Sequence, residues 1–477
     1  MAFTTIDSAG SLFEAGNSGD KVEVQSGAST RTTIDGGTGA DTLVFLSGTN
    51  AAGQTAIDVN LAGGADEIIL SGSNVFSSTI LAGAGGDTIS MSGIIAFNNT
   101  QLKAGDGNDD LYIAAEGMSG GTDIFLGGGA DTLVLSGGEA NGGVMTGGSI
   151  LGGAGADEIT LQGQVDLSAT TIFGGGGADL IVVSGIVGGE SQINSDSSAN
   201  GGGADTIDIG NGVVSATVKG KGGADEITIS GTMGNSARVE GNAGADLITL
   251  SGGFAGIAGF AGGGSGNDTI AIFTGITNSS NTIKGGGGAD SISFVDGGVV
   301  AEQASGTIIY GGAGADTIEL GLIETGSNAI DRGSRGHSGY IGLSELSDSS
   351  LDAYDVISGN ADISGYFFAI DTAAGITSFT IGVYNDSDTT TPAITAGVVS
   401  GATWASADST VTARAADLDE MLATKGTLVG FTAGTENFLF IQGGESGTSD
   451  DAVIKVNQAI TGGFDVDTDY EFYVNLG

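Results

Sequence analysis

Gly-x-Asp followed by alternating apolar residues recurs along most of this chain, as in "GGAGADTIEL" at 311–320. Aligned copies repeat at spacings of 20 to 26 residues. The aligned aspartates are Asp41, Asp66, Asp87, Asp109, Asp131, Asp157, Asp179, Asp205, Asp225, Asp246, Asp268, Asp290 and Asp316. A period in this range is typical of a solenoid, in which each repeat forms one coil and only stacked coils bury a core.

Each copy predicts two short strands. Glycine stands two residues before every aligned aspartate, Ile or Leu stands two residues after it, and another apolar residue stands four after it. This alternation puts both apolar side chains on one face of a strand. Seven residues before the aspartate stands Ile, Val or Leu, except at Ala261 and Ser198, which indicates a second strand. We therefore predict an all-β fold: a parallel β-roll or β-helix solenoid of about 13 coils of ~22 residues, followed by a smaller β-rich C-terminal domain.

The predicted domains follow from where the repeat stops. Residues 1–30 are expected to form an N-terminal cap, 31–325 the solenoid, 326–340 a linker and 341–477 the C-terminal β-rich domain. This last region holds most of the aromatic residues, among them Tyr366, Phe367, Phe368, Trp404, Phe438, Phe440, Phe472 and Tyr473. Within it, 378–385 and 437–444 have strand patterns, and 413–426 has helical spacing with a glycine stop.

Charge and composition exclude several classes of protein. The chain has 57 acidic and 12 basic residues, a formal net charge of −45, so it should repel nucleic acids and anionic membranes and attract cations. It has 93 glycines but a single proline and no three-residue period, which excludes collagen. There is no cysteine, and no apolar run is long enough for a membrane span.

Stacked coils would bring the aspartates into a column. Carboxylates about 4.8 Å apart repel each other, so something positive is expected between them. The few lysines and arginines of residues 30–325 are scattered, whereas Ca²⁺ prefers six to eight oxygen ligands, which carboxylates and the carbonyls of glycine turns can supply. The alternative is that each aspartate only bonds its own backbone, as in an Asx turn.

Several copies resemble the repeats-in-toxin pattern G-G-x-G-x-D-x-U-x, including those at 36–44, 152–160, 174–182, 262–270 and 311–319. The resemblance covers about residues 30–325. It implies a parallel β-roll with Ca²⁺ between turns, folding outside the cell, and export by a type I secretion system. The metal ligands it implies are the thirteen aligned aspartates and Asp106, since "AGDGNDDL" (104–111) is the copy richest in aspartate.

Two departures from the family pattern bear on the metal sites. Family repeats run every nine residues, whereas this chain has one motif per coil of roughly 22, which predicts a calcium ladder on one side only. Some copies also lack the leading glycines, for example "LAGGAD" (61–66) and "KGGAD" (221–225), so these sites are expected to be weak or empty.

Export is expected to use the C-terminus. The first twenty residues have neither a basic region nor an apolar core, so no Sec-type signal is expected there. Residues 438–456 are similar to segments near the C-terminus of type I-secreted repeat proteins. The predicted location is therefore extracellular, at the cell surface.

No catalytic site is expected. The one histidine, His337, cannot supply the H-E-x-x-H motif of zinc proteases. "GMSGG" (117–121) fits G-x-S-x-G formally, but it lies in a Gly-rich connector without a following helix, so we attribute it to chance. Glycan hydrolysis needs only paired carboxylates, which leaves a polysaccharide-active enzyme open.

The preferred functional hypothesis is a non-enzymatic, calcium-dependent structural protein that self-assembles into a surface layer, sheath or matrix filament. Relatives that the resemblance points to serve as surface-layer proteins and adhesins. The alternative is a secreted polysaccharide-binding module or glycan-active enzyme, in which Trp404 and Tyr366–Phe368 bind sugar rather than fill a core.

The basic cluster Arg332, Arg335 and His337 is either part of a linker or a contact for the acidic surface of a neighbouring subunit. An ice-binding face is a third possibility, although no outward threonine ladder is evident.

Overall fold

The structure is a computed structural model of the 477-residue chain. It describes residues 3–6, 12–14, 19–24, 32–45, 57–72, 75–94, 97–115, 117–137, 144–163, 166–196, 202–278, 280–295, 299–300, 308–320, 340–343, 355–359, 367–370, 380–381, 393–395, 398–400, 410–422, 424, 427–433, 435–443, 452–456, 460–466 and 471–476. Contacts divide the chain into two compact units, Met1–Gly231 with Ala237–Val239 and Thr232–Ser236 with Glu240–Gly477.

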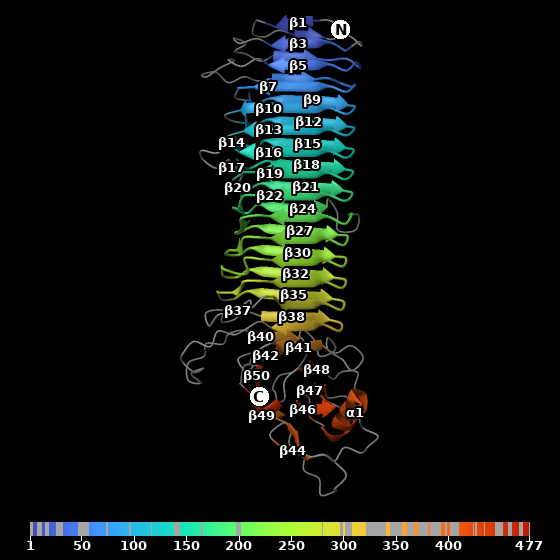
Figure 1. Cartoon of the computed structure of the whole chain (residues 1–477), viewed down its shortest axis with the longest axis vertical. Coiled ribbons are helices and arrows are strands. Elements are labelled where there is room, and N and C mark those ends of the chain that lie inside the picture. The colour runs from blue at the N-terminus through green and yellow to red at the C-terminus, as the bar shows by residue number, and fades with distance from the viewer. Residues whose placement is uncertain are drawn as a thin grey trace. The chain divides into compact units, whose positions relative to one another are not determined.

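The first unit is a parallel β-solenoid, as the repeat predicts, with coils of about 22 residues. The strands that follow the aligned aspartates form sheet 1, in which each strand pairs in parallel with its counterpart in the next coil (Figure 1). Its strands in this unit are β1 (Phe3–Ile6), β3 (Lys21–Val24), β5 (Thr42–Phe45), β7 (Glu67–Ser71), β10 (Thr88–Ile94), β13 (Asp110–Ala115), β16 (Thr132–Gly137), β19 (Glu158–Gln162), β22 (Leu180–Val183), β25 (Thr206–Ile209) and β28 (Glu226–Ile229). Burial alternates along them: in β13, Leu111 and Ile113 are buried while Asp110 and Tyr112 are exposed.

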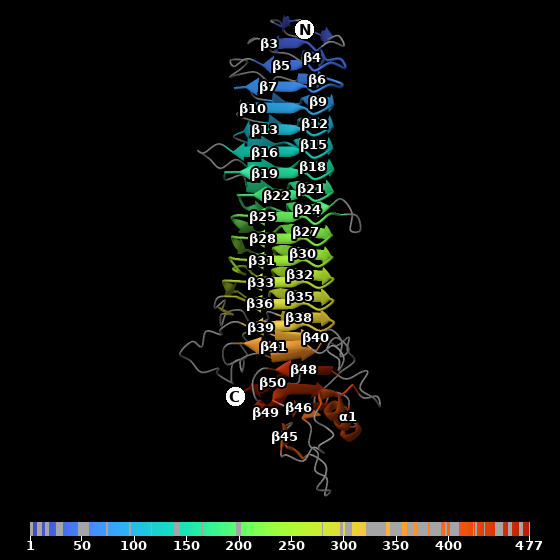
Figure 2. The same ribbon diagram turned by 45° about the vertical axis from the view of Figure 1, so that its right-hand side comes forward.

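Sheet 2 holds the strands that precede the Gly-rich turn (Figure 2). They are β2 (Leu12–Glu14), β4 (Thr32–Asp35), β6 (Ile57–Asn60), β9 (Thr79–Ala84), β12 (Gln101–Asp106), β15 (Asp123–Gly128), β18 (Ser149–Ala154), β21 (Thr171–Gly176), β24 (Gln192–Asp196) and β27 (Thr217–Gly222). From β4 to β27, each strand outside the Asp205 coil buries the apolar residue that stands seven positions before its aspartate. In the Asp205 coil, where the exception Ser198 stands at that position, Ile193 is buried instead and pairs with Ile172, because this coil has extra residues between its strand and its aspartate.

A third, shorter sheet, not predicted from the sequence, forms where variable connectors were expected. Sheet 3 consists in the first unit of β8 (Val75–Phe76), β11 (Phe97–Asn98), β14 (Gly117–Ser119), β17 (Val144–Thr146), β20 (Asp166–Ser168), β23 (Val187–Gly188) and β26 (Gly212–Val213). Phe97 and Met118 are buried and pair in register. Each coil in this region therefore has three sides around one apolar core, where two strands per coil were predicted.

The turn between sheets 2 and 1 explains the glycine two residues before the aspartate. Gly155 has φ of 130°, in the region that favours glycine, and a Cβ there would overlap the Gly129 carbonyl oxygen of the preceding coil. Close approach of successive backbones at this corner therefore excludes other residues.

The second unit contains equivalent coils. Sheet 1 here has β31 (Leu247–Leu250), β33 (Thr269–Ile272), β36 (Ser291–Phe294), β39 (Thr317–Leu320) and β41 (Asp355–Gly359); sheet 2 has β32 (Phe260–Ser265), β35 (Thr282–Gly287), β38 (Ile308–Ala313), β40 (Tyr340–Leu343) and β42 (Phe367–Ile370). Short strands β29 (Thr232–Met233), β34 (Gly275–Ile276) and β37 (Val299–Val300) supply the third side. β30 (Arg238–Ala243) includes residues of both units.

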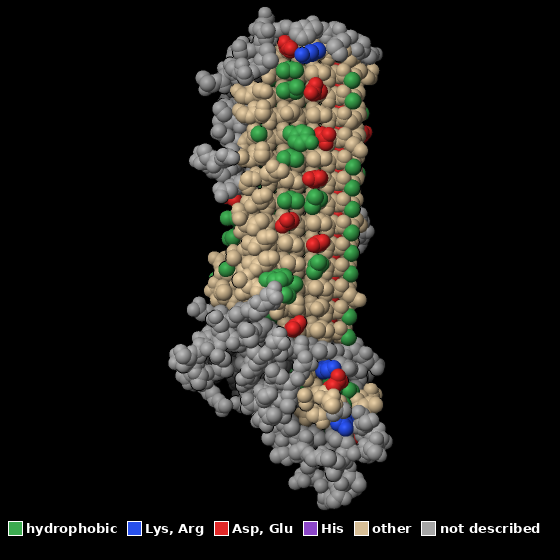
Figure 3. Space-filling model, in the orientation of Figure 1, with side chains coloured by type: hydrophobic (Ala, Val, Ile, Leu, Met, Phe, Trp, Pro, Cys, Tyr) green, Lys and Arg blue, Asp and Glu red, His purple; other side chains and the backbone are tan. Residues whose placement is uncertain are grey.

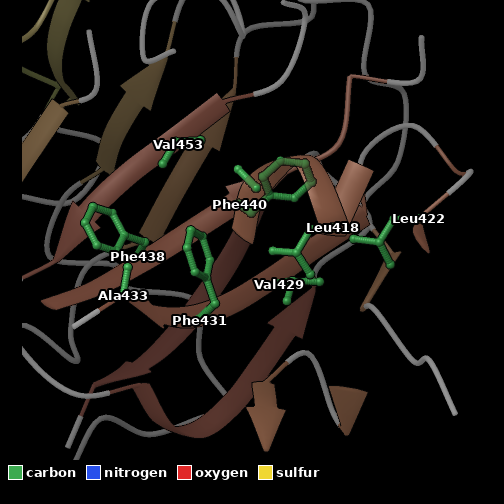
Figure 4. Packing of buried hydrophobic residues seen from close by; sticks show 9 residues of the cluster. Leu418, Leu422, Val429, Phe431, Ala433, Phe438, Phe440 and Val453 are labelled. Atoms are coloured by element: carbon green, nitrogen blue, oxygen red, sulfur yellow. The ribbon is translucent and has the colours of Figure 1, made fainter. Parts of the chain in front are cut away.

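The C-terminal part of the second unit adds a small antiparallel sheet. Its three strands are β46 (Thr427–Ala433), β47 (Glu436–Ile441) and β48 (Ala452–Val456). β43 (Thr380–Ile381) and β45 (Val398–Ser400) pair with β46 in parallel, and β44 (Ala393–Thr395) pairs with β45. β50 (Glu471–Leu476) pairs antiparallel with β49 (Ile460–Val466) and with β42 of sheet 2. Helix α1 (Val411–Met421) begins at an N-cap, Thr410, whose Oγ1 accepts a hydrogen bond from the Ala413 N–H, and it ends before the expected glycine stop. Leu418 packs with Phe431, Phe438 and Phe440 (Figure 4). Of the aromatic residues predicted for the core of this region, Phe438 and Phe440 are buried in this cluster.

The domain boundaries predicted from the repeat can be compared with the strands. β1 already pairs in parallel with β3, so strand stacking starts within the expected cap. β38, β40 and β42 pair in parallel, so stacking continues past residue 325. No helix among the described residues is long and apolar enough to cross a membrane.

Candidate cation-binding column

The aligned aspartates lie at one corner of the coils and are buried. Each one immediately precedes a strand of sheet 1 and is 1–4% exposed. The first unit stacks those from Asp41 to Asp225, and the second stacks those from Asp246 to Asp316. The structure thus brings the predicted residues together within each unit, apart from Asp106.

One carboxylate oxygen of each aspartate has a clear structural role. The main-chain N–H of Asp109 donates to Oδ1 of Asp131 in the next coil at 2.8 Å, and the N–H of Asp131 donates to Oδ1 of Asp157 at 2.9 Å. The same bond links successive aspartates elsewhere in the first unit, and in the second unit from Asp246 to Asp316. Oδ1 therefore bonds the backbone of the neighbouring coil, not the aspartate's own backbone as the Asx alternative holds. A bond within one coil is made at Asp41, whose Oδ2 accepts from the Gly37 N–H at 3.2 Å.

The second carboxylate oxygen has a different environment. Among the described residues, Oδ2 is buried without a hydrogen-bond partner at Asp66, Asp87, Asp109, Asp131, Asp157, Asp179, Asp205, Asp268 and Asp290. Buried polar atoms without partners are rare and call for an explanation. Asparagine would offer the same Oδ1 acceptor without the charge, so the structural bond does not account for aspartate at every position.

Burial makes ionisation of these groups costly. Desolvation raises the pKa of Asp109, Asp157 and Asp290 to about 7 and that of Asp66 and Asp179 to about 6, partly offset by the backbone hydrogen bond to Oδ1. The charge of adjacent column aspartates adds to the rise in most cases, for example Asp131 and Asp179 around Asp157. At neutral pH these carboxyl groups therefore need a proton or a cation.

Some coils bring two oxygens close to a glycine. A Cβ on Gly36, five residues before Asp41, would lie 2.7 Å from Asp41 Oδ2 and 2.8 Å from the Leu61 carbonyl oxygen of the next coil. We call this arrangement a cradle: a glycine five residues before the aspartate, with Oδ2 and the next coil's carbonyl oxygen facing its missing side chain. The same arrangement occurs at Gly152, Gly174, Gly241, Gly263 and Gly285.

Other coils have a residue with a side chain in place of that glycine. The residue five before the aspartate is Leu61 in the Asp66 coil, Ala82 in the Asp87 coil, Ala104 in the Asp109 coil and Leu126 in the Asp131 coil, and all four side chains are buried. We call these the filled coils. The copies that lack the leading glycine in the sequence thus include coils with no cradle.

The cradles match a hard cation in donor chemistry. Both facing atoms are oxygens, one from a carboxylate and one from a carbonyl, as Ca²⁺ prefers. No group of three or more His, Cys, Asp or Glu side chains suited to a metal ion occurs among the described residues. A cation in a cradle would therefore take one carboxylate, with the rest of its oxygens from backbone or water.

Two aspartates differ from the sequence prediction. Asp20 joins the column, since its N–H donates to Asp41 Oδ1 at 2.6 Å. The Gly-x-Asp pattern does not include it because Ser18 stands in place of the glycine. Val22 and Val24 nevertheless follow it at the repeat spacing. Asp106, predicted as a ligand, lies at the end of β12, where its side chain is exposed and its register partners are Ala84 and Gly128. It is outside the column.

The other candidate motifs form no site in the described parts of the chain. In "GMSGG", Gly117–Ser119 is β14 and Ser119 Oγ accepts a hydrogen bond from Asn98 Nδ2, so this is a sheet 3 strand rather than a nucleophile elbow. Trp404, Tyr366, Arg332, Arg335 and His337 lie outside the described residues.

Comparison with known proteins gives no family assignment. No family of known proteins matches the chain, and no curated protein matches it. The parallel stacking of coils agrees with a β-roll of the repeats-in-toxin kind at the level of the fold. Calcium binding and secretion remain predictions.

Proposed function

We propose that this chain is a secreted, non-enzymatic structural protein of the repeats-in-toxin kind, whose coils fold when Ca²⁺ neutralises the aspartate column and which then self-assembles into a surface layer, sheath or filament. The observation that carries the proposal is the column itself. Its carboxylates are stacked in successive buried coils, and Oδ2 of Asp157 and Asp179 faces a carbonyl oxygen across a cradle without a hydrogen-bond partner among the described residues. Export in an unfolded state and folding outside the cell follow if the required cation is abundant only there.

The outer face of sheet 1 supports the assembly part of the proposal. In the first unit the residue after the column aspartate is acidic in every second coil from Glu67 through Asp110 to Glu158, with Thr88 and Thr132 in register between them. These carboxylates are exposed and recur roughly every 9–10 Å. Separate acidic side chains also lie along the coil surface seen in Figure 3. A periodic row of carboxylates is suited to Ca²⁺ bridges between copies.

A calcium titration of the purified chain tests the proposal. Circular dichroism would follow β-structure and light scattering would follow particle size, with EGTA added at the end. We expect Ca²⁺ to induce β-structure first and larger ordered particles at higher concentration, and EGTA to reverse both. Folding without any divalent cation at pH 8 would contradict the calcium part, and a lasting monomer in saturating Ca²⁺ would contradict the assembly part.

A further inference from the structure

One coil carries a second interior carboxylate outside the repeated motif. Asp196, the last residue of β24, pairs in register with Gly175. The same register position holds Gly153, Gly127 and Gly105 in the coils before it. Asp196 thus replaces a turn glycine with a carboxylate.

The Asp196 side chain is fully buried and incompletely satisfied. Its exposed fraction is 0%, and Oδ2 accepts a hydrogen bond from the Gly222 N–H at 3.2 Å. Oδ1 has no hydrogen-bond partner among the described residues. A buried carboxylate oxygen with no donor is costly unless it is protonated or binds a cation.

The surroundings of Asp196 are acidic and rich in oxygen. Asp179, Asp205 and Asp225 all interact electrostatically with it, and each is buried. The Ser195 hydroxyl is buried next to it, donates to the Gly220 carbonyl and lies within hydrogen-bonding reach of Asp205. The pKa of Asp196 is raised to about 7, chiefly by desolvation and also by the neighbouring carboxylates, against the lowering effect of the hydrogen bond from the Gly222 N–H.

We infer that Asp196 and Asp205 together hold one hard divalent cation of the Ca²⁺ type, at a site distinct from the cradles. Two carboxylates in one coil give this position twice the charge of any cradle, and all the neighbouring donors are oxygens, which favours Ca²⁺ over a softer metal. The inference extends the proposed calcium binding to a residue outside the motif, but it does not require the cradles to bind ions.

Counting bound ions tests the site. Wild-type chain and variants would be dialysed against saturating Ca²⁺ at pH 7.5, and the Ca²⁺ bound per folded chain would be measured by elemental analysis. Asp196→Asn keeps an oxygen that can accept from the Gly222 N–H, and we expect it to bind one Ca²⁺ fewer than wild type. Asp208→Asn, which removes a charge from the outer face of β25 in the same coil, is the matched control and should leave the count unchanged.

A second variant keeps the test valid if the first one does not fold. Asp196→Gly restores the residue that neighbouring coils have at this register, so it should fold even if Asp196→Asn does not, again with one ion fewer. Unchanged counts in the folded Asp196 variants, or an equal loss in Asp208→Asn, would overturn the inference, as would a wild type that binds no Ca²⁺. A wild type that loses one ion on Asp196 substitution but never assembles would support this site while contradicting the proposed function.

Discussion

In the first unit, the cradle coils and the filled coils make the same backbone hydrogen bond to Oδ1 of the aspartate. They differ in what lies near its second oxygen, Oδ2. Asp109, in a filled coil, and Asp157, in a cradle coil, accept the preceding aspartate's N–H at Oδ1 with nearly equal lengths, 2.8 and 2.9 Å. Oδ2 of Asp109 lies in a coil where Ala104 occupies the inner position, whereas Oδ2 of Asp157 faces the Gly174 carbonyl across Gly152. The difference separates a structural role, common to all coils, from an ion-binding role open only to some.

The two kinds of coil should also be neutralised differently. Burial raises the pKa of both Asp109 and Asp157 to about 7, so both resist ionisation at neutral pH. A filled coil has a buried side chain in place of the cradle glycine, so we expect protonation to be its means of neutralisation. A cradle coil can take either a proton or Ca²⁺.

Converting a filled coil into a cradle coil should have the largest effect. Leu126→Gly removes a fully buried side chain, and we expect it to reduce the free energy of unfolding by about 3–5 kcal/mol because of the cavity left behind. It should also increase the stabilisation that Ca²⁺ gives. Denaturant unfolding with and without Ca²⁺ measures both effects. Leu126→Ala, which matches the neighbouring filled coils, is the control and should lose stability without the calcium gain.

Neutralising one column aspartate should distinguish the two kinds of coil. At pH 8 in EGTA, Asp109→Asn and Asp157→Asn should each raise the free energy of unfolding by about 2–4 kcal/mol, because the amide keeps the Oδ1 acceptor and removes a charge whose pKa is about 7 when buried. In saturating Ca²⁺ the gain should persist for Asp109→Asn and shrink for Asp157→Asn. If both variants show the same change in the free energy of unfolding in Ca²⁺, the distinction between filled and cradle coils is wrong.

Filling a cradle should have a smaller effect. In Gly152→Ala the new Cβ would lie 2.1 Å from the Gly174 carbonyl oxygen and 2.6 Å from Asp157 Oδ2, so the backbone must shift, and we expect a loss of about 1–3 kcal/mol. Calorimetric titration should show one Ca²⁺ site fewer. Gly176→Ala, at a half-buried position with nothing closer than 4.0 Å to its missing Cβ, provides a matched glycine replacement that should keep every site.

A carboxylate on the outer face should matter least to stability. Glu158 directly follows Asp157 but is exposed, so Glu158→Gln should change the free energy of unfolding by less than about 0.5 kcal/mol. Light scattering in Ca²⁺ should nevertheless show weaker assembly if outer carboxylates bridge copies. A stability loss as large as that of Gly152→Ala would mean that burial is not what sets the column apart.

The sequence predicted the main sheets because their signal repeats. Apolar residues at fixed distances from each aspartate, such as Leu111 and Leu102 around Asp109, indicated two strands per coil, and both are buried in them. Sheet 3 was missed because its strands are short, lie at varying distances from the motif and bury a single side chain, for example Met118. With no alternation over several residues, such a strand has no signal in the sequence.

The candidate site was predicted in part. Alignment on the motif identified the column, but it could not show that Oδ1 bonds the neighbouring coil or that Oδ2 lacks a partner, because both depend on how coils stack. Asp196 carries no motif around it, so only its register with Gly175 reveals it as an interior residue. Asp106 was included because it lies close in sequence to Asp109, although strand geometry turns it outward.

The most direct test is the melting temperature measured from pH 5 to pH 8, in EGTA and in saturating Ca²⁺. The pKa of Asp157 rises from 3.8 to about 7 on folding, so its protonation stabilises the fold fully below pH 4, and this contribution is lost as the pH rises through 7. We predict that the melting temperature in EGTA falls between pH 5 and pH 8 and that Ca²⁺ abolishes most of that fall. A melting temperature in EGTA that stays level or increases with pH, with no effect of Ca²⁺ at pH 8, would contradict a column that must be neutralised to fold.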